Sequence, residues 1–184
     1  MNALSGLQKS CQFNILQDHV GLISVAHQAV LRLSSFSNMV DMKTTHTSLP
    51  FAGHTLHFVE FDPASFREQD LLWLPHYAQL QHAGRKRKTE HLAGRIAAIY
   101  ALREYGYKCV PAIGELRQPV WPTGVYGSIS HCGTTALAVV SRQPIGIDIE
   151  EIFSVQTARE LTDNIITPAE HERLAECGLT FSLA

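Results

Sequence analysis

The stretch that most constrains what this chain can fold into is residues 145–150, where isoleucine alternates with small or acidic residues. The sequence there is Ile-Gly-Ile-Asp-Ile-Glu. A period of two predicts a half-buried strand, so Asp148 and Glu150 point the same way with Cα atoms roughly 6.5 to 7 Å apart. Two carboxylates at that spacing can reach one hard cation, and Mg²⁺ suits them best because it keeps waters and takes phosphate oxygens as further ligands. The alternative is a strand whose polar face simply meets water.

Composition limits the classes of protein that are possible. With 184 residues, of which 45% are hydrophobic and 17% charged, the chain suits one soluble globular domain with a core of its own. A net charge of −2 argues against nucleic acid as a partner, so any phosphate site has to be local. Four scattered cysteines without a Cys-x-x-Cys pair indicate reduced thiols and a cytoplasmic protein. Neither a spanning helix nor a signal peptide is indicated.

The first third of the chain gives few clear signals. Residues 1–38 are expected to be a poorly ordered or amphipathic lead-in, with a helix beginning after Asp18, and the compact domain is expected to begin near Met42. Residues 55–61 predict a strand, and residues 65–74 a short helix that Pro75 ends. The histidines of this region match no compact metal-ligand spacing, so we expect them to be surface or packed residues.

Residues 85–105 predict the best helix of the chain. Leu92, Ile96, Ile99 and Leu102 form one apolar stripe, and Gly106 follows as a C-terminal stop. The helix begins with four consecutive basic residues.

Arg87, His91 and Arg95 recur along this helix at i, i+4 and i+8. They therefore share one face over roughly 12 Å of helix axis. A compound with several phosphates could lie against this face, and cations at a helix N-terminus invite an anionic partner. The alternative is a solvated basic helix start.

The next segment predicts a hairpin. A turn-rich connection over residues 114–124 carries Arg117, residues 125–129 predict a strand, and residues 136–140 predict the returning strand. Ser130 and His131 are expected in a polar turn between the two strands. Phosphate binding is the preferred role for them, since adjacent residues on extended backbone point apart and no G-x-S-x-G elbow marks a hydrolase. Further on, a capping box at residues 167–170 predicts a short helix to residue 176.

Three ordered motifs give the chain a family resemblance. They are Arg-Lys-x-Glu at 87–90 with Gly-Arg-x-Ala at 94–97, Trp-Pro at 121–122 leading to Gly-Ser-Ile-Ser-His-Cys at 127–132, and Ile-Gly-Ile-Asp-Ile-Glu at 145–150. From Met42 onward the chain resembles the 4′-phosphopantetheinyl transferases of the surfactin-synthetase-activating type. It is most similar to the members that prime the aryl and peptidyl carrier domains of siderophore synthesis. The resemblance implies an α+β fold of two similar halves with coenzyme A in the cleft between them.

This family fold divides the chain into three parts. Residues 1–41 become an N-terminal extension, 42–143 the first half, and 144–184 the start of the second half. The reaction implied is attack of a carrier serine hydroxyl on the β-phosphate of coenzyme A, which releases adenosine 3′,5′-bisphosphate. Asp148 and Glu150 match the family's catalytic magnesium ligands. The resemblance implies a cytoplasmic monomer that acts on carrier domains, peripherally membrane-associated as part of its synthase assembly.

The resemblance also assigns residues to coenzyme A. Arg87 and Arg95 match basic residues that hold the nucleotide phosphates, and Ser130 and His131 match residues at the adenosine 3′-phosphate. Arg117 lies where relatives often carry a basic group.

The chain departs from the family in one respect. It ends at Ala184, where the family continues with a Lys-Glu-x-x-x-x-Lys helix that supplies a further magnesium ligand and a candidate base, so we expect impaired transfer. Two alternatives stay open, a non-catalytic remnant that binds coenzyme A or carrier protein, and an unrelated metal-dependent phosphoesterase.

Overall fold

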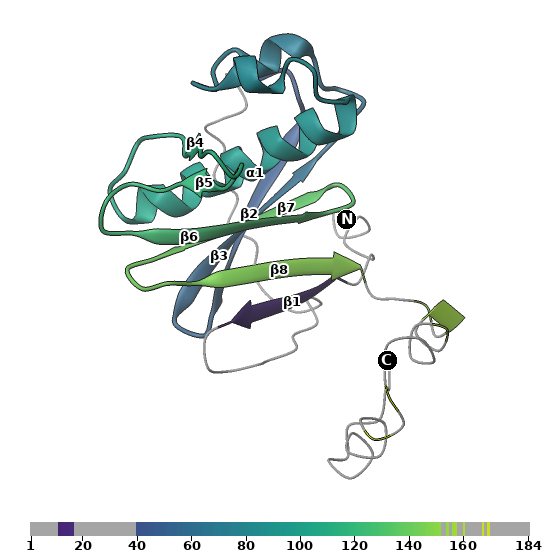
Figure 1. Ribbon diagram of the computed structural model, residues 1–184, viewed down its shortest axis with the longest axis vertical. Coiled ribbons are helices and arrows are strands. Elements are labelled where there is room, and N and C mark those ends of the chain that lie inside the picture. The colour runs from purple at the N-terminus through teal and green to yellow at the C-terminus, as the bar shows by residue number, and fades with distance from the viewer. Residues whose placement is uncertain are drawn as a thin grey trace, which may run out of the picture.

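A computed structural model describes residues 40–151 throughout, the backbone of residues 11–16, and isolated residues between 154 and 169. The fold is α+β, as expected: one long helix covers an antiparallel sheet of four strands (Figure 1). The strand order in this sheet is β2-β3-β7-β6. The strands are β2 (Thr44–Phe51), β3 (His54–Phe61), β6 (Tyr126–Cys132) and β7 (Thr135–Ser141). Within the described residues, no helix is long and apolar enough to cross a membrane.

Strand β7 shows why the sheet is covered on both faces. All its residues from Ala136 to Val140 are buried, and side chains alternate between faces along a strand. Ala136 and Ala138 belong to the core beneath the helix, whereas Leu137 and Val139 belong to the core on the opposite face. The small alanine side chains allow the helix to approach the sheet closely.

The long helix α1 spans Arg85–Glu104, which confirms the predicted helix. Its apolar stripe is buried against the sheet. Gly106 follows with φ +81° and donates its N–H to the carbonyl of Arg103 at 3.0 Å, while Tyr107 donates to Leu102 at 3.1 Å. These two bonds form a Schellman motif, which requires the left-handed backbone that glycine adopts without strain.

Strand β8 (Gly146–Glu151) lies on the face of the sheet opposite α1 (Figure 1). It pairs antiparallel with β1 (Cys11–Leu16) and forms a separate two-stranded sheet. A strand at residues 11–16 was not expected in the N-terminal lead-in. The helix predicted after Asp18 and the helix predicted after the 167–170 capping box lie outside the described residues, apart from isolated positions of the latter. The division into three parts stays a prediction.

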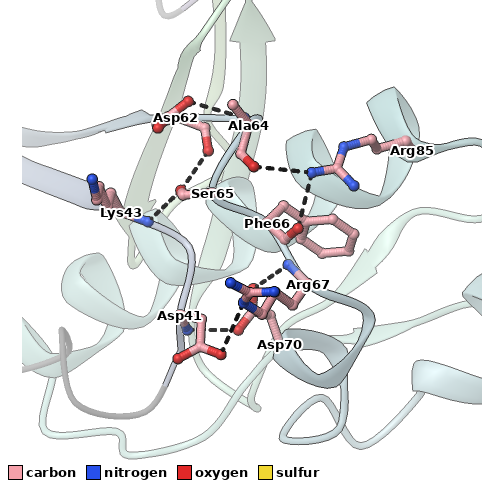
Figure 2. Close-up of polar contacts among 9 residues, drawn as sticks. All are labelled: Asp41, Lys43, Asp62, Ala64, Ser65, Phe66, Arg67, Asp70 and Arg85. Carbon is pink, nitrogen blue, oxygen red and sulfur yellow. Dashed lines mark hydrogen bonds and ion pairs between the residues drawn. The ribbon is translucent and has the colours of Figure 1, made fainter.

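The helix predicted at residues 65–74 is wrong. A short 3₁₀ helix, η2 (Glu68–Leu71), occupies this region, and a second, η3 (Tyr77–Leu80), follows it. The buried Asp70 carboxylate accepts hydrogen bonds from the backbone N–H groups of Asp41 at 2.6 Å and Arg67 at 2.8 Å (Figure 2). Because this carboxylate ties the segment to the start of β2, tertiary contacts take the place of a continuous α-helix.

Candidate functional site

The site forms where α1 crosses the edge strand β6. Gly94 makes this close crossing possible, because a Cβ atom at that position would lie 2.8 Å from Cγ2 of Ile129. One turn earlier, the Glu90 carboxylate lies 3.8 Å from Nδ1 of His131. The crossing therefore places the basic face of α1 beside His131.

The predicted basic face of α1 is present, but its members differ in exposure. Arg87 is exposed, whereas His91 and Arg95 are buried, Arg95 with only 4% of its surface accessible. One guanidinium nitrogen of Arg95, Nη2, donates to the carbonyl oxygen of Ala112 at 3.3 Å. Burial, and secondarily the charge of Arg87, lower the pKa of Arg95 to about 10. Arg95 is thus still a cation at neutral pH, held mostly out of water.

A second histidine joins this face from outside the helix. His76, the residue before η3, lies with its Nε2 atom 2.8 Å from Nε2 of His91. Burial, and secondarily Arg95, lower the pKa of His76 to about 4 and that of His91 to about 3. Both rings are neutral at pH 7. His76 is buried, which agrees with the expectation of a surface or packed histidine. Its position in the sequence did not indicate that it would pack against His91 in the candidate site.

The structure also separates the four basic residues that begin α1. Arg85 turns back and donates through Nη2 to the carbonyl oxygen of Pro63 at 2.8 Å. It also donates to the carbonyl oxygens of Ala64 at 3.3 Å and Phe66 at 2.9 Å (Figure 2). Lys88 is buried and its Nζ lies 2.9 Å from the Glu68 carboxylate.

Those two cations fix the helix to the preceding segment. Lys86, with 88% of its side chain accessible, and the exposed Arg87 are the members of the basic run without a described bond to the preceding segment. They are therefore the ones available to an anion.

The polar turn predicted to include Ser130 and His131 is wrong. Strand β6 continues through Cys132, which pairs with Thr135, and the turn consists of Gly133 and Thr134. Gly133 has φ +57°, as the first position of a tight hairpin turn requires.

Because Ser130 and His131 are neighbours on a strand, they point to opposite faces of the sheet. The Ser130 hydroxyl lies against β8 and His131 against α1. The structure thus separates the two residues that the resemblance assigned to one phosphate.

Asp148 and Glu150 share one side of β8, as the alternation predicted. Both are exposed, while Ile147 and Ile149 are buried. The hydroxyl of Ser130 donates to Oδ1 of Asp148 at 2.5 Å. The backbone N–H of Ile149 contacts the same oxygen at 3.0 Å.

Ser130 thereby orients the Asp148 carboxylate across the gap between the two sheets. The described contacts of this carboxylate all involve Oδ1. The negative field at this edge also acts on Cys132, whose thiol pKa is raised by burial first and by Glu150 among the nearby carboxylates.

Arg117 lies apart from these groups. It is exposed, with φ +65°, in the turn between the short strands β4 (Ala112–Ile113) and β5 (Pro119–Val120). Its backbone N–H donates to the carbonyl of Gly114 at 2.9 Å. The base of this hairpin contacts Arg95 through Ala112, but no described contact joins the Arg117 side chain to the site, and its role stays a prediction.

Comparison with known proteins assigns the chain to a class. Residues 76–141, which contain α1, β6 and β7, match the family model of the 4′-phosphopantetheinyl transferase N-terminal domain. A 4′-phosphopantetheinyl transferase of Mycobacterium tuberculosis, PptT, is 37% identical over 70 residues, which cover 35% of this chain and 31% of the relative.

Closer relatives identify a branch within that class. Enterobactin synthase component D of Escherichia coli strain K12 is 95% identical over 143 residues, 78% of this chain and 69% of the relative. The protein of the same name from Salmonella typhimurium is 63% identical over 143 residues, 78% of this chain and 61% of the relative. The chain belongs to the enterobactin synthase component D branch of the 4′-phosphopantetheinyl transferase family.

Proposed function

We propose that this chain transfers the 4′-phosphopantetheine arm of coenzyme A to a serine of apo aryl and peptidyl carrier domains in enterobactin synthesis. The observation that supports this function best is that β6 lies between basic side chains on one side and a carboxylate on the other. Arg87 and Arg95 lie on the α1 side of the strand, and Asp148, held by Ser130, lies on the β8 side. A substrate that carries both a nucleotide and a metal-bound pyrophosphate needs both kinds of group.

The carboxylates fit magnesium in part. Asp148 and Glu150 offer hard oxygen donors on one exposed side of β8, and Ser130 fixes one oxygen of Asp148. No group of three or more His, Cys, Asp or Glu side chains suited to a metal occurs in the part of the chain that the structure describes. Such a site needs waters and phosphate oxygens to complete it, which is the usual way in which Mg²⁺ binds. When bound, the ion supplies charge neutralisation on the pyrophosphate.

Each remaining residue has a separate role in the proposed reaction. Arg87 and Arg95 bind phosphate oxygens, and the buried Arg95 does so with little competition from water. His131, from the α1 side of β6, is proposed to approach the adenosine 3′-phosphate. Ser130 acts through Asp148 and is a positioning residue. The carrier serine oxygen loses its proton to solvent and forms a bond to the β-phosphorus, while the bond from that phosphorus to the leaving oxygen of adenosine 3′,5′-bisphosphate breaks.

The test is mass spectrometry of an apo carrier domain incubated with the 184-residue chain, coenzyme A and Mg²⁺. We expect the carrier to gain the mass of phosphopantetheine, and Asp148→Asn to abolish the gain. Glu151→Gln is a matched control, because Glu151 is an exposed carboxylate on the same strand outside the proposed metal pair. If wild-type chain binds coenzyme A in calorimetry but leaves the carrier mass unchanged, the chain is a binding protein and not a transferase.

A further inference from the structure

Basic side chains surround His91. Arg87 and Arg95 lie one turn away from it on either side along α1, His76 approaches from the segment before η3, and His131 approaches from β6. All four of these groups lower the pKa of His91, after burial, which is the largest cause. The two arginine charges in this cluster favour the binding of an anion.

One carboxylate borders the cluster. Glu90 lies 3.8 Å from His131 and 3.9 Å from Lys86. The described side-chain contacts of Glu90 are with those two residues and not with His91 or His76. The carboxylate therefore leaves the histidine pair without a direct anionic partner among the described residues.

The hydrogen bond between the two imidazoles limits how many protons the pair can carry. Nε2 of His76 and Nε2 of His91 are 2.8 Å apart, so one must donate and the other accept. The pair can gain one proton and keep this bond, as an imidazolium donating to an imidazole. A second proton would place two N–H groups against each other and break the bond.

Two buried polar atoms of the cluster lack partners among the described residues. They are Nδ1 of His76 and Nε of Arg95. His76 is 7% and Arg95 4% accessible. Buried polar atoms normally pair with protein, ligand or ordered water, so these two atoms are open to a phosphate oxygen or a water.

We propose that the His76–His91 pair takes up one proton when the phosphates of coenzyme A bind beside Arg95. The pair then acts as a further, proton-dependent cation of the site beside Arg87 and Arg95, and His76 is an additional residue for binding the substrate. This inference rests on the proposed function, since it takes coenzyme A as the ligand. The proton comes from solvent and stays on the pair while the ligand is bound.

The direction of the pH dependence follows from the charges. In the free protein, burial and the nearby arginines keep both rings neutral at pH 7, with pKa values of about 4 and about 3. A phosphate bound at Arg95 places negative charge beside the pair, which favours the protonated form and raises the pKa of the pair. Coenzyme A therefore binds more tightly as the pH falls from 8 to 6, by up to about tenfold per pH unit for one proton taken up.

The experiment is isothermal titration calorimetry of coenzyme A in two buffers of different ionisation enthalpy at pH 7, which gives the number of protons taken up. His76→Gln is the test variant, because glutamine can keep a hydrogen bond to His91 but does not titrate. His82→Gln is the control, since His82 is exposed and has no described contact with the cluster. Protonation of the ligand's own phosphates is common to all three proteins and cancels in the comparison.

We expect wild type and His82→Gln to take up close to one proton more than His76→Gln. Equal uptake by all three proteins would refute the proton role of the pair, even if His76→Gln bound less tightly at every pH. If coenzyme A does not bind wild type, the proposed function and this inference fail together. If it binds without proton uptake, only this inference fails.

A second measurement does not depend on the variant folding. Imidazole ¹⁵N chemical shifts of the wild-type chain distinguish neutral from protonated rings. With coenzyme A at pH 7, one ring of the pair should change to the protonated pattern. Two rings that remain neutral in the saturated complex would contradict the proposal.

Discussion

Replacement of Gly94 by alanine tests whether the close crossing of α1 over β6 builds the site. In an ordinary helix interior this substitution stabilises by about 0.8 to 1.0 kcal/mol, because alanine is the better helix former. Here the new Cβ atom would lie 2.8 Å from Cγ2 of Ile129, whereas carbon atoms pack best at about 3.5 to 4.0 Å. The helix or the strand must therefore move by roughly 1 Å.

Overpacking of this kind typically costs about 1 to 3 kcal/mol. After the gain in helix propensity is subtracted, we expect Gly94→Ala to destabilise the protein by about 1 kcal/mol, within a range of roughly 0 to 2. For a chain of this size that lowers the Tm by about 2 to 4 °C per kcal/mol. His91 and Arg95 flank Gly94, so the affinity for coenzyme A should fall as well.

The assay is thermal unfolding of four proteins: wild type, Gly94→Ala, Ile129→Ala and the double variant. If the two side chains clash, Gly94→Ala should destabilise less, or even stabilise, in the Ile129→Ala background. A rise in Tm for Gly94→Ala alone would refute the reasoning, because it would mean that Ile129 rotates aside at little cost. Equal effects of Gly94→Ala in both backgrounds would also refute it, since the crossing would then not depend on this contact.

Three further outcomes are expected. Asp148→Asn should remove magnesium-dependent coenzyme A binding with little change in Tm, because Asp148 is exposed. Ile147→Ala, at a buried position, should instead lower the free energy of unfolding by roughly 2 to 5 kcal/mol. Equal losses of Tm in the two variants would indicate a structural role for Asp148. Arg85→Ala should lower the Tm because it removes the hydrogen bonds to the carbonyl oxygens of residues 63, 64 and 66, while Lys86→Ala should leave the Tm unchanged. Equal Tm values for these two variants would mean that the Arg85 hydrogen bonds do not stabilise the fold. Burial lowers the pKa of His57 to about 4, so its contribution to stability is complete above its unfolded pKa near 6.5 and is lost as the pH falls towards 4. His57→Gln should therefore reduce the fall in Tm between pH 7.5 and 5. An unchanged fall in Tm would mean that the protonation of His57 is not coupled to folding.

The elements whose signals are local were predictable from the sequence. A strand at 145–150 and a helix at 85–105 follow from periodicities of 2 and 3.6, because one face of each must be buried. The same alternation placed Asp148 and Glu150 on one exposed side. The ordered motifs were sufficient to indicate the family, and they did so because each keeps its own residue spacing.

Tertiary packing decided how these elements meet. Ser130 and His131 are adjacent in sequence, yet one orients Asp148 and the other faces α1. Both lie in extended strand, because the hairpin turn begins only at Gly133, two residues after His131. The strand at residues 11–16 depends on β8 for its pairing, so its own sequence did not predict it.

The site depended on packing even more strongly. His76 reaches His91 only because the segment before α1 folds back along the helix, a contact between residues 15 apart that no periodicity encodes. Likewise, the four basic residues at 85–88 look equivalent in the sequence. In the structure, carbonyl oxygens of the preceding segment accept the hydrogen bonds of Arg85, and Glu68 pairs with Lys88. The sequence determines which charged residues a helix carries. Tertiary packing determines which of these residues have partners within the protein and which remain open to a ligand.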